Sequence, residues 1–341
     1  MAELNDPLQV EGFAFLELTA PPGEEVGALL TTMGFAAGAD GALTRYDQGS
    51  VTLILNVSGS GRAAAFRAAH GAGVCGMGLW VRDAAAAFAL ALERGAEAAD
   101  APDLAMRAIR GVGDTLIYFV DNADQAALQD LLGPARENGA SIGVAEIDHV
   151  AFNLRRGEMA RWSDFFERVF GFAQVRYFHI SGKHTGLKTK ALASANGAVR
   201  IPLNESQDDH SQIEEFLRVF NGEGVQHVGF GLADIHAGVE ALRARGVAFQ
   251  DTPDAYYDAL PARVSGHVED VARLKANGVL LDGDAEEGLL LQIFTRMTIG
   301  PLFFELIQRK GNDGFGEGNV TALFESVEAD QIRRGALKER A

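Results

Sequence analysis

Alternating apolar and polar residues mark several short segments of the chain, and each is followed by a segment with helical spacing. DHVAFNL (148–154) and QHVGFGL (226–232) alternate as half-buried strands do, whereas WSDFFERVF (162–170) and AGVEALRAR (237–245) have the apolar spacing of amphipathic helices. Further strand-like segments follow, among them SVTLILNV (50–57), TLIYFV (115–120), AVRIPLNE (198–205), GLLLQIFT (288–295) and PLFFELIQ (301–308). The pattern predicts the element order βαβββ, four times.

Two internal repeats relate the first half of the chain to the second. With an offset of 151, residues 73–98 align with residues 224–249, and with an offset of 137, residues 12–35 align with residues 149–172. Because each repeat spans a predicted strand and the helix after it, the two halves are predicted to share one architecture.

Each repeat contains one position at which a histidine of the second half lies over a glycine of the first. His227 lies over Gly76 in one frame, and His149 lies over Gly12 in the other. A duplicated scaffold that keeps one working site and has emptied the other would show this pattern.

A βαβββ unit exposes one apolar sheet face, so two units must pair and curve around a shared cavity. We therefore expect an α+β fold in which four units form two domains. The segment 121–143 is rich in small, polar and glycine residues and separates the second unit from the third. The predicted domains are residues 1–140, the pair of units without the two histidines, and residues 145–341, the pair that carries them, with the C-terminal helix.

The C-terminal segment NVTALFESVEADQIRRG (319–335) is predicted to be a helix with Asn319 as its N-cap. Its apolar residues follow helical spacing and should lie against the body of the domain: Val320, Leu323, Phe324 and Val327. The glycine-rich segment before it, GNDGFGEGN (311–319), would let this helix act as a lid.

Composition narrows the classes of function. The chain has 341 residues, 47% of them apolar, and a net charge of −17, which would repel nucleic acids and acidic membrane surfaces. No apolar run approaches the roughly 20 residues that span a bilayer. The single cysteine, Cys75, excludes an internal disulfide and a thiolate metal cluster. We expect a cytoplasmic protein without nucleic-acid or membrane partners.

Three polar side chains on otherwise apolar strands are candidate metal ligands. Side chains alternate along a strand, so His149 and His227 should point into one cavity if the third and fourth units pair. Glu305, in PLFFELIQ, is costly to bury unless it is paired or bound to a metal. Two histidines and a carboxylate are the ligands of non-haem Fe(II) oxygenases, although other divalent ions fit the same set. A lone histidine is more often a core residue, but two at equivalent repeat positions favour the metal.

The second half also contains the motifs of a known family. DHVAFNL, TGLKTKALAS, RIPLNES, SQIEEFL, EGVQHVGFG, DTPDAYYD, LLLQIFT and FFELIQRKGNDGFGEGN occur in this order. Together they resemble the bacterial 4-hydroxyphenylpyruvate dioxygenases of the vicinal oxygen chelate superfamily, densely from about residue 146 to 335 and as fold and repeat only before that. The resemblance implies two half-barrel domains of the vicinal-oxygen-chelate type, with the C-terminal helix over the active site.

The resemblance also implies roles for individual residues. It implies that His149, His227 and Glu305 bind Fe(II), in agreement with the strand pattern. The amides of Gln292, Gln226 and Asn204 would take part in catalysis, in a substrate pocket that is also lined by Thr189, Pro202, Gln212, Phe294, Phe303, Phe315 and Val320.

The implied reaction converts 4-hydroxyphenylpyruvate and O₂ to homogentisate and CO₂, in tyrosine and phenylalanine catabolism. We expect the enzyme to be a homo-oligomer, a dimer or a tetramer. Thr189 stands where the family usually has serine, and Val320 stands where the dioxygenases usually have phenylalanine. The related 4-hydroxymandelate synthase, which uses the same substrate, has a branched aliphatic residue at the latter position and is the main alternative. Pro202 and Asn204 are typical of the dioxygenase. A glyoxalase-like lyase or isomerase and a ligand-sequestering protein of the same superfamily are further alternatives.

Overall fold

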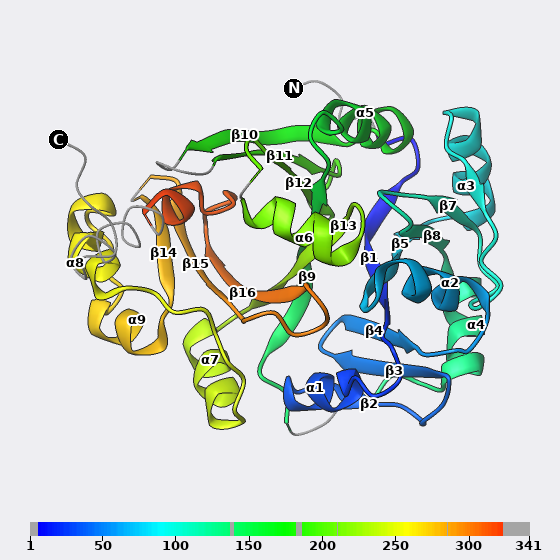
Figure 1. Ribbon diagram of the computed structural model, residues 1–341, viewed down its shortest axis with the longest axis horizontal. Coiled ribbons are helices and arrows are strands. Elements are labelled where there is room, and N and C mark those ends of the chain that lie inside the picture. The colour runs from blue at the N-terminus through cyan, green and yellow to red at the C-terminus, as the bar shows by residue number, and fades with distance from the viewer. Residues whose placement is uncertain (1–5, 137–139, 182–185, 210, 285, 323–341) are drawn as a thin grey trace.

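Two eight-stranded sheets, one from each half of the chain, make up the computed structural model (Figure 1). The structure describes residues 6–136, 140–181, 186–209, 211–284 and 286–322. Each half contributes two units of the order βαβββ, which confirms the α+β fold of four units.

The first sheet is built from two units that are each followed by one more helix. The first unit comprises β1 (Val10–Thr19), α1 (Val26–Thr32), β2 (Ala36–Ala37), β3 (Leu43–Gln48) and β4 (Val51–Asn56), with α2 (Gly61–His70) after it. The second comprises β5 (Gly73–Val81), α3 (Ala84–Glu93), β6 (Ala98–Ala99), β7 (Ala108–Arg110) and β8 (Leu116–Val120), with α4 (Asn122–Leu132) after it.

The second sheet repeats this plan, with two extra helices in its last unit. The third unit comprises β9 (Val144–Leu154), α5 (Met159–Phe170), β10 (Ala173–Ser181), β11 (Gly186–Ala193) and β12 (Arg200–Ser206), with α6 (Gln212–Phe220) after it. The fourth comprises β13 (Gly224–Leu232), α7 (Ile235–Ala244), α8 (Asp254–Arg263), α9 (Val271–Asn277), β14 (Leu280–Asp284), β15 (Gly288–Phe294) and β16 (Phe303–Lys310).

Both sheets have the same strand order. It is β2-β3-β4-β1-β5-β8-β7-β6 in the first and β10-β11-β12-β9-β13-β16-β15-β14 in the second. The central strands of each sheet, β1 with β5 and β9 with β13, pair antiparallel, and each pairs parallel with its outer neighbour. The first strands of the third and fourth units therefore lie side by side, as the repeat predicts, and β16 lies next to them.

The helix after the first strand begins in the same way in the second and fourth units. The carboxylate of Asp83 accepts a hydrogen bond from the Ala86 amide (2.9 Å), and that of Asp234 accepts one from the Ala237 amide (3.1 Å). These N-caps satisfy amides that have no partner within the helix. Gly171 ends α5 with a φ of 73°, a left-handed conformation that favours glycine.

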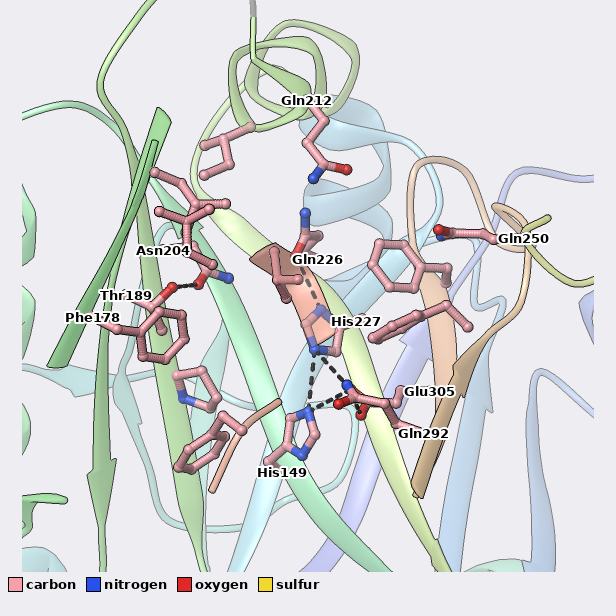
Figure 2. Close-up of a pocket in the computed structure, with 18 of the residues that line it drawn as sticks. His149, Phe178, Thr189, Asn204, Gln212, Gln226, His227, Gln250, Gln292 and Glu305 are labelled. Carbon is pink, nitrogen blue, oxygen red and sulfur yellow. Dashed lines mark hydrogen bonds and ion pairs between the residues drawn. The ribbon is translucent and has the colours of Figure 1, made fainter. Parts of the chain in front are cut away.

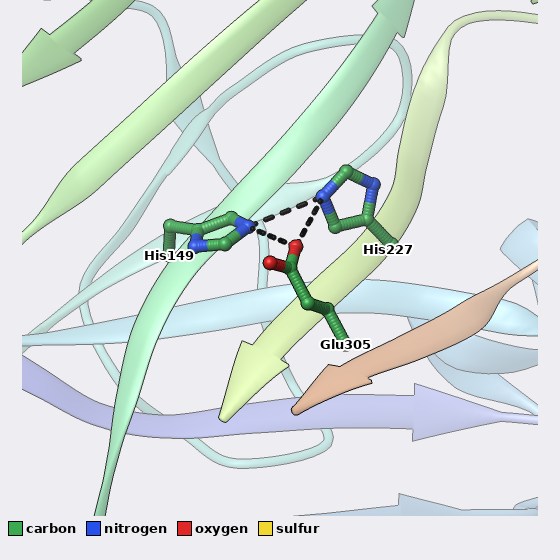
Figure 3. A group of neighbouring side chains, drawn as sticks. All are labelled: His149, His227 and Glu305. Atoms are coloured by element: carbon green, nitrogen blue, oxygen red, sulfur yellow. Dashed lines mark hydrogen bonds and ion pairs between the residues drawn. The ribbon is translucent and has the colours of Figure 1, made fainter. Parts of the chain in front are cut away.

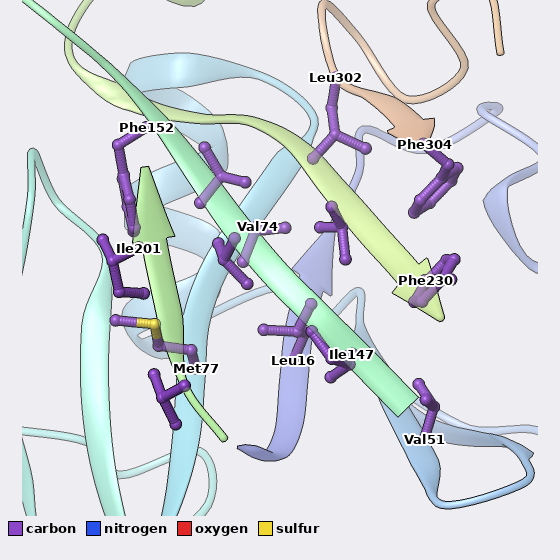
Figure 4. Packing of buried hydrophobic residues seen from close by; sticks show 14 of the residues in the cluster. Leu16, Val51, Val74, Met77, Ile147, Phe152, Ile201, Phe230, Leu302 and Phe304 are labelled. Atoms are coloured by element: carbon purple, nitrogen blue, oxygen red, sulfur yellow. The ribbon is translucent and has the colours of Figure 1, made fainter. Parts of the chain in front are cut away.

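One face of each sheet belongs to a shared apolar core (Figure 4). In β9, Phe152 and its alternate neighbours Val150 and Leu154 are fully buried in this core, together with residues of the first sheet such as Leu16 and Met77. The other face of β9 carries His149. The alternation of β9 thus separates the residues that hold the two sheets together from those that can form a site.

Apolar side chains of the strands and of α4 cover the opposite face of the first sheet. Phe15, Ile54, Leu116 and Tyr118 form a second apolar cluster there, and each is at most 1% exposed. This face therefore has little room for a ligand. The corresponding face of the second sheet contains the cavity described below.

The C-terminal helix begins earlier than predicted. Residues 317–322 are helical, so Asn319 lies inside the first turn and is not the N-cap. The carboxylate of Asp282 accepts hydrogen bonds from the amides of Gly318 (2.8 Å) and Asn319 (3.3 Å) and so caps the helix from a neighbouring strand. Leu323, Phe324 and Val327, with the rest of the predicted helix, lie outside the described residues.

The segment 121–143, predicted to separate the halves, contains α4. Asp121 and Asp124 form a capping box at its start, which explains why a run of small and polar residues is helical. The domain division at residues 140 and 145 stays a prediction, which the two separate sheets support. No helix among the described residues is long and apolar enough to cross a membrane.

Candidate metal centre

Three adjacent strands bring the predicted ligands together. Gly229 of β13 pairs with His149 of β9 on one side and with Glu305 of β16 on the other. His227 lies two residues before Gly229 on the same strand, so its side chain points to the same face. His227 and Glu305 follow His149 by 78 and 156 positions in the sequence and are thereby its neighbours in space.

The ligand atoms of the three side chains converge on one point (Figure 3). The Nε2 atoms of His149 and His227 are 3.1 Å apart. Oε2 of Glu305 lies 3.1 Å from Nε2 of His149 and 3.4 Å from Nε2 of His227. The three groups therefore present two nitrogen atoms and one oxygen atom to the same small volume.

The three groups strongly shift one another's pKa. Burial acts to lower the pKa of His149, but the charge of Glu305 and the hydrogen bonds to Asp148 and Glu305 raise it to about 9. Burial lowers the pKa of His227. Burial acts to raise the pKa of Glu305, but the two imidazoles lower it to about 2. Both imidazoles would ligate a metal ion in the neutral form, and the carboxylate would ligate it in the charged form.

The local backbone and the donor types both fit a divalent metal. A Cβ atom at Gly229 would lie 2.4 Å from Cε1 of His149, so the imidazole occupies space that only glycine leaves open. Two imidazoles and a carboxylate suit iron and related divalent ions, and three ligands leave coordination positions for other molecules. The residues therefore fit a metal centre.

The orientation of His149 is fixed from behind. Its Nδ1 lies 2.8 Å from the carboxylate of Asp148, which is 1% exposed. Arg309 donates to both carboxylate oxygens of Asp148, over 2.7 and 2.8 Å. Burial acts to raise the pKa of Asp148, but the bonds to Arg309 and His149 hold it far below its usual value. A charged carboxylate therefore holds Nδ1 as the donor and directs Nε2 at the metal position.

Glu305 is held by a chain of amides and hydroxyls that reaches the C-terminal helix. Gln292 Nε2 donates to Oε1 of Glu305 (3.0 Å), and Asn319 Nδ2 donates to Oε1 of Gln292 (2.8 Å). Tyr256 Oη donates in turn to Oδ1 of Asn319 (2.5 Å). The helix start is therefore connected to Glu305, a candidate metal ligand, through two fully buried amides.

A cavity of about 930 Å³, including its open mouth, lies over the three ligands (Figure 2). All thirteen predicted site residues line it: His149, His227, Glu305, Gln292, Gln226, Asn204, Thr189, Pro202, Gln212, Phe294, Phe303, Phe315 and Val320. The structure thus brings the whole set to one place, while the role of each residue stays a prediction.

Six further residues line the cavity that the sequence analysis does not name: Phe178, Ile180, Leu187, Ile213, Gln250 and Leu280. The alternation of β10 and β11 provides a signal for some of them. Leu187 lies two positions before Thr189 on β11, and Phe178 pairs with Thr189 on the neighbouring strand. Gln250 lies outside the named helices and strands, and no strand alternation indicates it.

The first sheet has different residues at the positions of the ligands. Phe15 pairs with Gly78 as His149 pairs with Gly229, and its ring lies over that glycine in the same way. The counterpart of His149 in the first sheet is therefore Phe15. The sequence alignment, which places His149 over Gly12, is wrong by three positions in this strand. The alignment of His227 with Gly76 agrees with the pairing, because Gly76 lies opposite β1 as His227 lies opposite β9.

A buried carboxylate occupies the space beside Gly76. Glu17, 2% exposed, accepts hydrogen bonds from Tyr118 Oη (2.7 Å) and Asn56 Nδ2 (2.7 Å). Burial raises the pKa of Glu17, and the two hydrogen bonds offset that shift in part. Tyr118 pairs with Gly78 as Glu305 pairs with Gly229, so a phenol in the first sheet stands at the position of the Glu305 carboxylate.

Comparison with known proteins gives close relatives over the whole chain. Residues 4–132 match the family described as "Hydroxyphenylpyruvate dioxygenase, HPPD, N-terminal", and residues 146–270 match the "Glyoxalase/Bleomycin resistance protein/Dioxygenase superfamily". The chain is 45% identical to "Hemolysin VllY" of Vibrio vulnificus, with 99% of each chain covered. It is also 45% identical to a 4-hydroxyphenylpyruvate dioxygenase of Legionella pneumophila, with 98% of this chain and 99% of that protein covered.

A solved structure supports the same relationship. A triple mutant of 4-hydroxymandelate synthase from Streptomyces coelicolor superposes with a TM-score of 0.79 and 32% identity, with 95% of this chain and 99% of that chain covered. These matches confirm the vicinal oxygen chelate fold that the sequence motifs predict.

Gly229→Ala should weaken metal binding. The added Cβ would lie 2.4 Å from the imidazole of His149, so the ring must move and misplace Nε2. An anaerobic titration should show an affinity for Fe(II) that is lower by about 10- to 100-fold, the loss that is usual when a group that orients a metal ligand is removed. Gly231→Ala is the matched control, because its Cβ would meet the side chain of the exposed Glu146, which can rotate away. Equal affinities of the two variants would contradict this account.

Glu17→Gln should raise the free energy of unfolding at neutral pH. Because burial raises the pKa of Glu17, the folded protein holds its proton more tightly than the unfolded chain does. Stability is therefore lost as pH rises above the unfolded value of about 4.3, and glutamine removes that loss. Denaturant unfolding from pH 4 to 8 should show a gain that grows with pH. Glu24→Gln makes the same change at an exposed position, and an equal gain there would refute the explanation.

Proposed function

The chain belongs to the 4-hydroxyphenylpyruvate dioxygenase family, and on that premise we propose that it is an Fe(II)-dependent dioxygenase. It converts 4-hydroxyphenylpyruvate and O₂ to homogentisate and CO₂, a step in tyrosine breakdown. The observation that carries the proposal is the convergence of His149, His227 and Glu305 at the floor of a cavity with aromatic and amide walls.

The ligand set suits iron, and three protein ligands leave room for a 2-oxo acid and O₂. Bound Fe(II) would supply a Lewis acid for the keto and carboxylate oxygens of the substrate and a redox centre for O₂. The protein's own contribution is to hold the ligands, orient the aromatic ring and keep water out.

Amide side chains in the cavity have defined orientations. Thr189 Oγ1 donates to Oδ1 of Asn204 (2.8 Å), which leaves the NH₂ group of Asn204 as the donor for a substrate oxygen. His227 Nδ1 lies 3.0 Å from Oε1 of Gln226, which likewise leaves the NH₂ group of Gln226 for the substrate. Figure 2 shows the amides of Gln212 and Gln226 facing each other above His227. Such fixed donors suit a substrate with a phenol and a 2-oxo acid.

Aromatic rings enclose the metal position. The ring of Phe303 stacks on that of His227, with 5.0 Å between the ring centroids and 15° between the planes. The ring of Phe315 meets that of His149 edge to face, with 5.9 Å between the centroids. Phe294 packs against Phe303 at 6.0 Å and also lines the cavity. These rings exclude water from the ligands and offer flat surfaces to a phenyl ring.

The alternative product, 4-hydroxymandelate, is favoured by one residue. Val320 lines the cavity and supplies fewer contact atoms than the phenylalanine usual in the dioxygenases. Pro202 and Asn204 line the same cavity and are typical of the dioxygenase. Relatives of 42–45% identity over nearly the whole chain also favour the dioxygenase. Cytoplasmic location and homo-oligomeric assembly stay predictions.

Oxygen uptake tests the proposed function. The Fe(II)-loaded protein should consume O₂ when 4-hydroxyphenylpyruvate is added and should release CO₂ and homogentisate. His149→Ala, His227→Ala and Glu305→Ala should each abolish uptake and lower the iron content, because each removes one of three ligands.

A glyoxalase-like lyase or isomerase would transform its substrate without consuming O₂, and a sequestering protein would bind the compound without turnover. Either result, or near-normal uptake and iron content in any one of the three variants, would overturn the proposal.

Chromatography of the products tests the role of Val320. We expect homogentisate as the main product and, at most, a minor share of 4-hydroxymandelate. The variant Val320→Phe should lower that minor share, because added ring contacts restrict the substrate and a shift of about 1 Å decides which carbon is attacked. A wild-type protein that makes mainly 4-hydroxymandelate would show that the synthase is the correct assignment.

A further inference from the structure

A small apolar cluster joins the first sheet's helix α2 to helix α6, which stands at the cavity. It consists of Ala63, Phe66, Cys75, Phe216 and Phe220, and each is at most 3% exposed. The rings of Phe66 and Phe220 meet edge to face at 5.8 Å. The C-terminal end of α6 is therefore packed against the half of the chain that lacks the metal ligands.

His70, the last residue of α2, binds the end of α6 directly. Its Nδ1 lies 3.1 Å from the backbone oxygen of Phe220, and its ring stacks on the Phe220 ring at 4.8 Å and 15°. Its Nε2 lies 2.9 Å from the carboxylate of Asp114. Arg62 donates to the backbone oxygen of Asp114 over 2.6 Å. Both ring nitrogens of His70 are thus held by groups on different elements.

The turn after α6 is fitted to the same surface. Asn221, with a φ of 58°, donates from Nδ2 to the backbone oxygen of Ala69 (3.1 Å). A Cβ atom at Gly222 would lie 3.1 Å from Cε1 of His70, and one at Gly113 would lie 2.3 Å from the backbone oxygen of Glu223. The turn 221–223 therefore has little freedom to move relative to the first sheet.

This turn connects two elements that contribute cavity residues. Helix α6 begins with Gln212, and β13 begins at Gly224 and carries Gln226 and His227. The helix has nine residues, so Gln212 lies about 12 Å from Phe220, at the end that His70 binds. A tilt of the helix about that end would therefore move Gln212.

We infer that His70 is a positioning residue for the cavity: it fixes the turn between α6 and β13 and thereby the amides of Gln212 and Gln226. The inference rests on the proposed function for the identity of the ligand. It gives the metal-free half of the chain a role in substrate binding, through contacts that reach neither the substrate nor the metal.

Another hydrogen bond between the two halves provides a matched control. Arg245, which follows α7, donates from Nη1 to the backbone oxygen of Thr32 (3.2 Å). Neither residue lines the cavity, and α7 carries none of its lining residues. Arg245→Ala therefore removes a contact between the halves without releasing the turn 221–223.

The experiment compares His70→Leu, Asp114→Ala and Arg245→Ala with the wild type. Calorimetric titration of the anaerobic Fe(II) protein with 4-hydroxyphenylpyruvate gives Kd, and hydrogen exchange gives the protection of amides 221–227. We expect His70→Leu to raise Kd about fivefold, within the range in which remote residues act. The iron content should not change, and exchange at 221–227 should be faster. His70→Gln should restore part of the affinity, because its amide can donate to the Phe220 carbonyl.

Asp114→Ala should raise Kd less than His70→Leu does. Because Asp114 is partly exposed, this variant should fold, and it therefore tests the inference if His70→Leu does not fold. Wild-type Kd and wild-type exchange in both variants would refute the inference, as would an equal rise of Kd in Arg245→Ala. A wild-type protein that does not bind 4-hydroxyphenylpyruvate would instead refute the proposed function. The exchange data would then decide whether His70 fixes the turn.

Discussion

The structure depends on holding two imidazoles and a carboxylate with their ligand atoms 3.1 to 3.4 Å apart in a buried site. Such a cluster is costly without a cation, because each group loses water and must be compensated by the others. Three adjacent strands supply one side chain each, and Gly229 between them leaves room for the imidazole of His149. The cost is offset by buried partners: Asp148 with Arg309, the amide of Gln292 and the amide of Gln226.

The two sheets share one topology and differ in what fills their free faces. In the first sheet, Phe15 and Tyr118 stand where the second has His149 and Glu305, and apolar side chains fill the space. Glu17 remains as a buried carboxylate that is hydrogen-bonded to neutral groups. The free face of the first sheet is therefore packed as a core, whereas that of the second sheet lines a cavity.

Strand alternation and the repeat were enough to predict the four units and the group of His149, His227 and Glu305, because period-two patterns report directly on which face a side chain occupies. The sequence alignment gave the wrong counterpart of His149 in the first half of the chain. The two units differ by three residues between the first strand and the end of the helix, so an alignment that matches the glycine at the helix end misaligns the strand. Asn319 was predicted as a cap from local sequence, whereas Asp282, far away in the chain, caps the helix. Contacts of this kind depend on tertiary structure and leave no local pattern.

The most direct test of this account is a crystal structure of the protein prepared anaerobically with Fe(II) and 4-hydroxyphenylpyruvate. The account predicts one iron ion bonded to Nε2 of His149, Nε2 of His227 and a carboxylate oxygen of Glu305, at roughly 2.0–2.2 Å as is usual for such donors on a divalent ion. The 2-oxo acid should occupy further positions, and the amide of Gln292 should not be a ligand. Iron at another place, or bound without one of these three residues, would contradict the central claim.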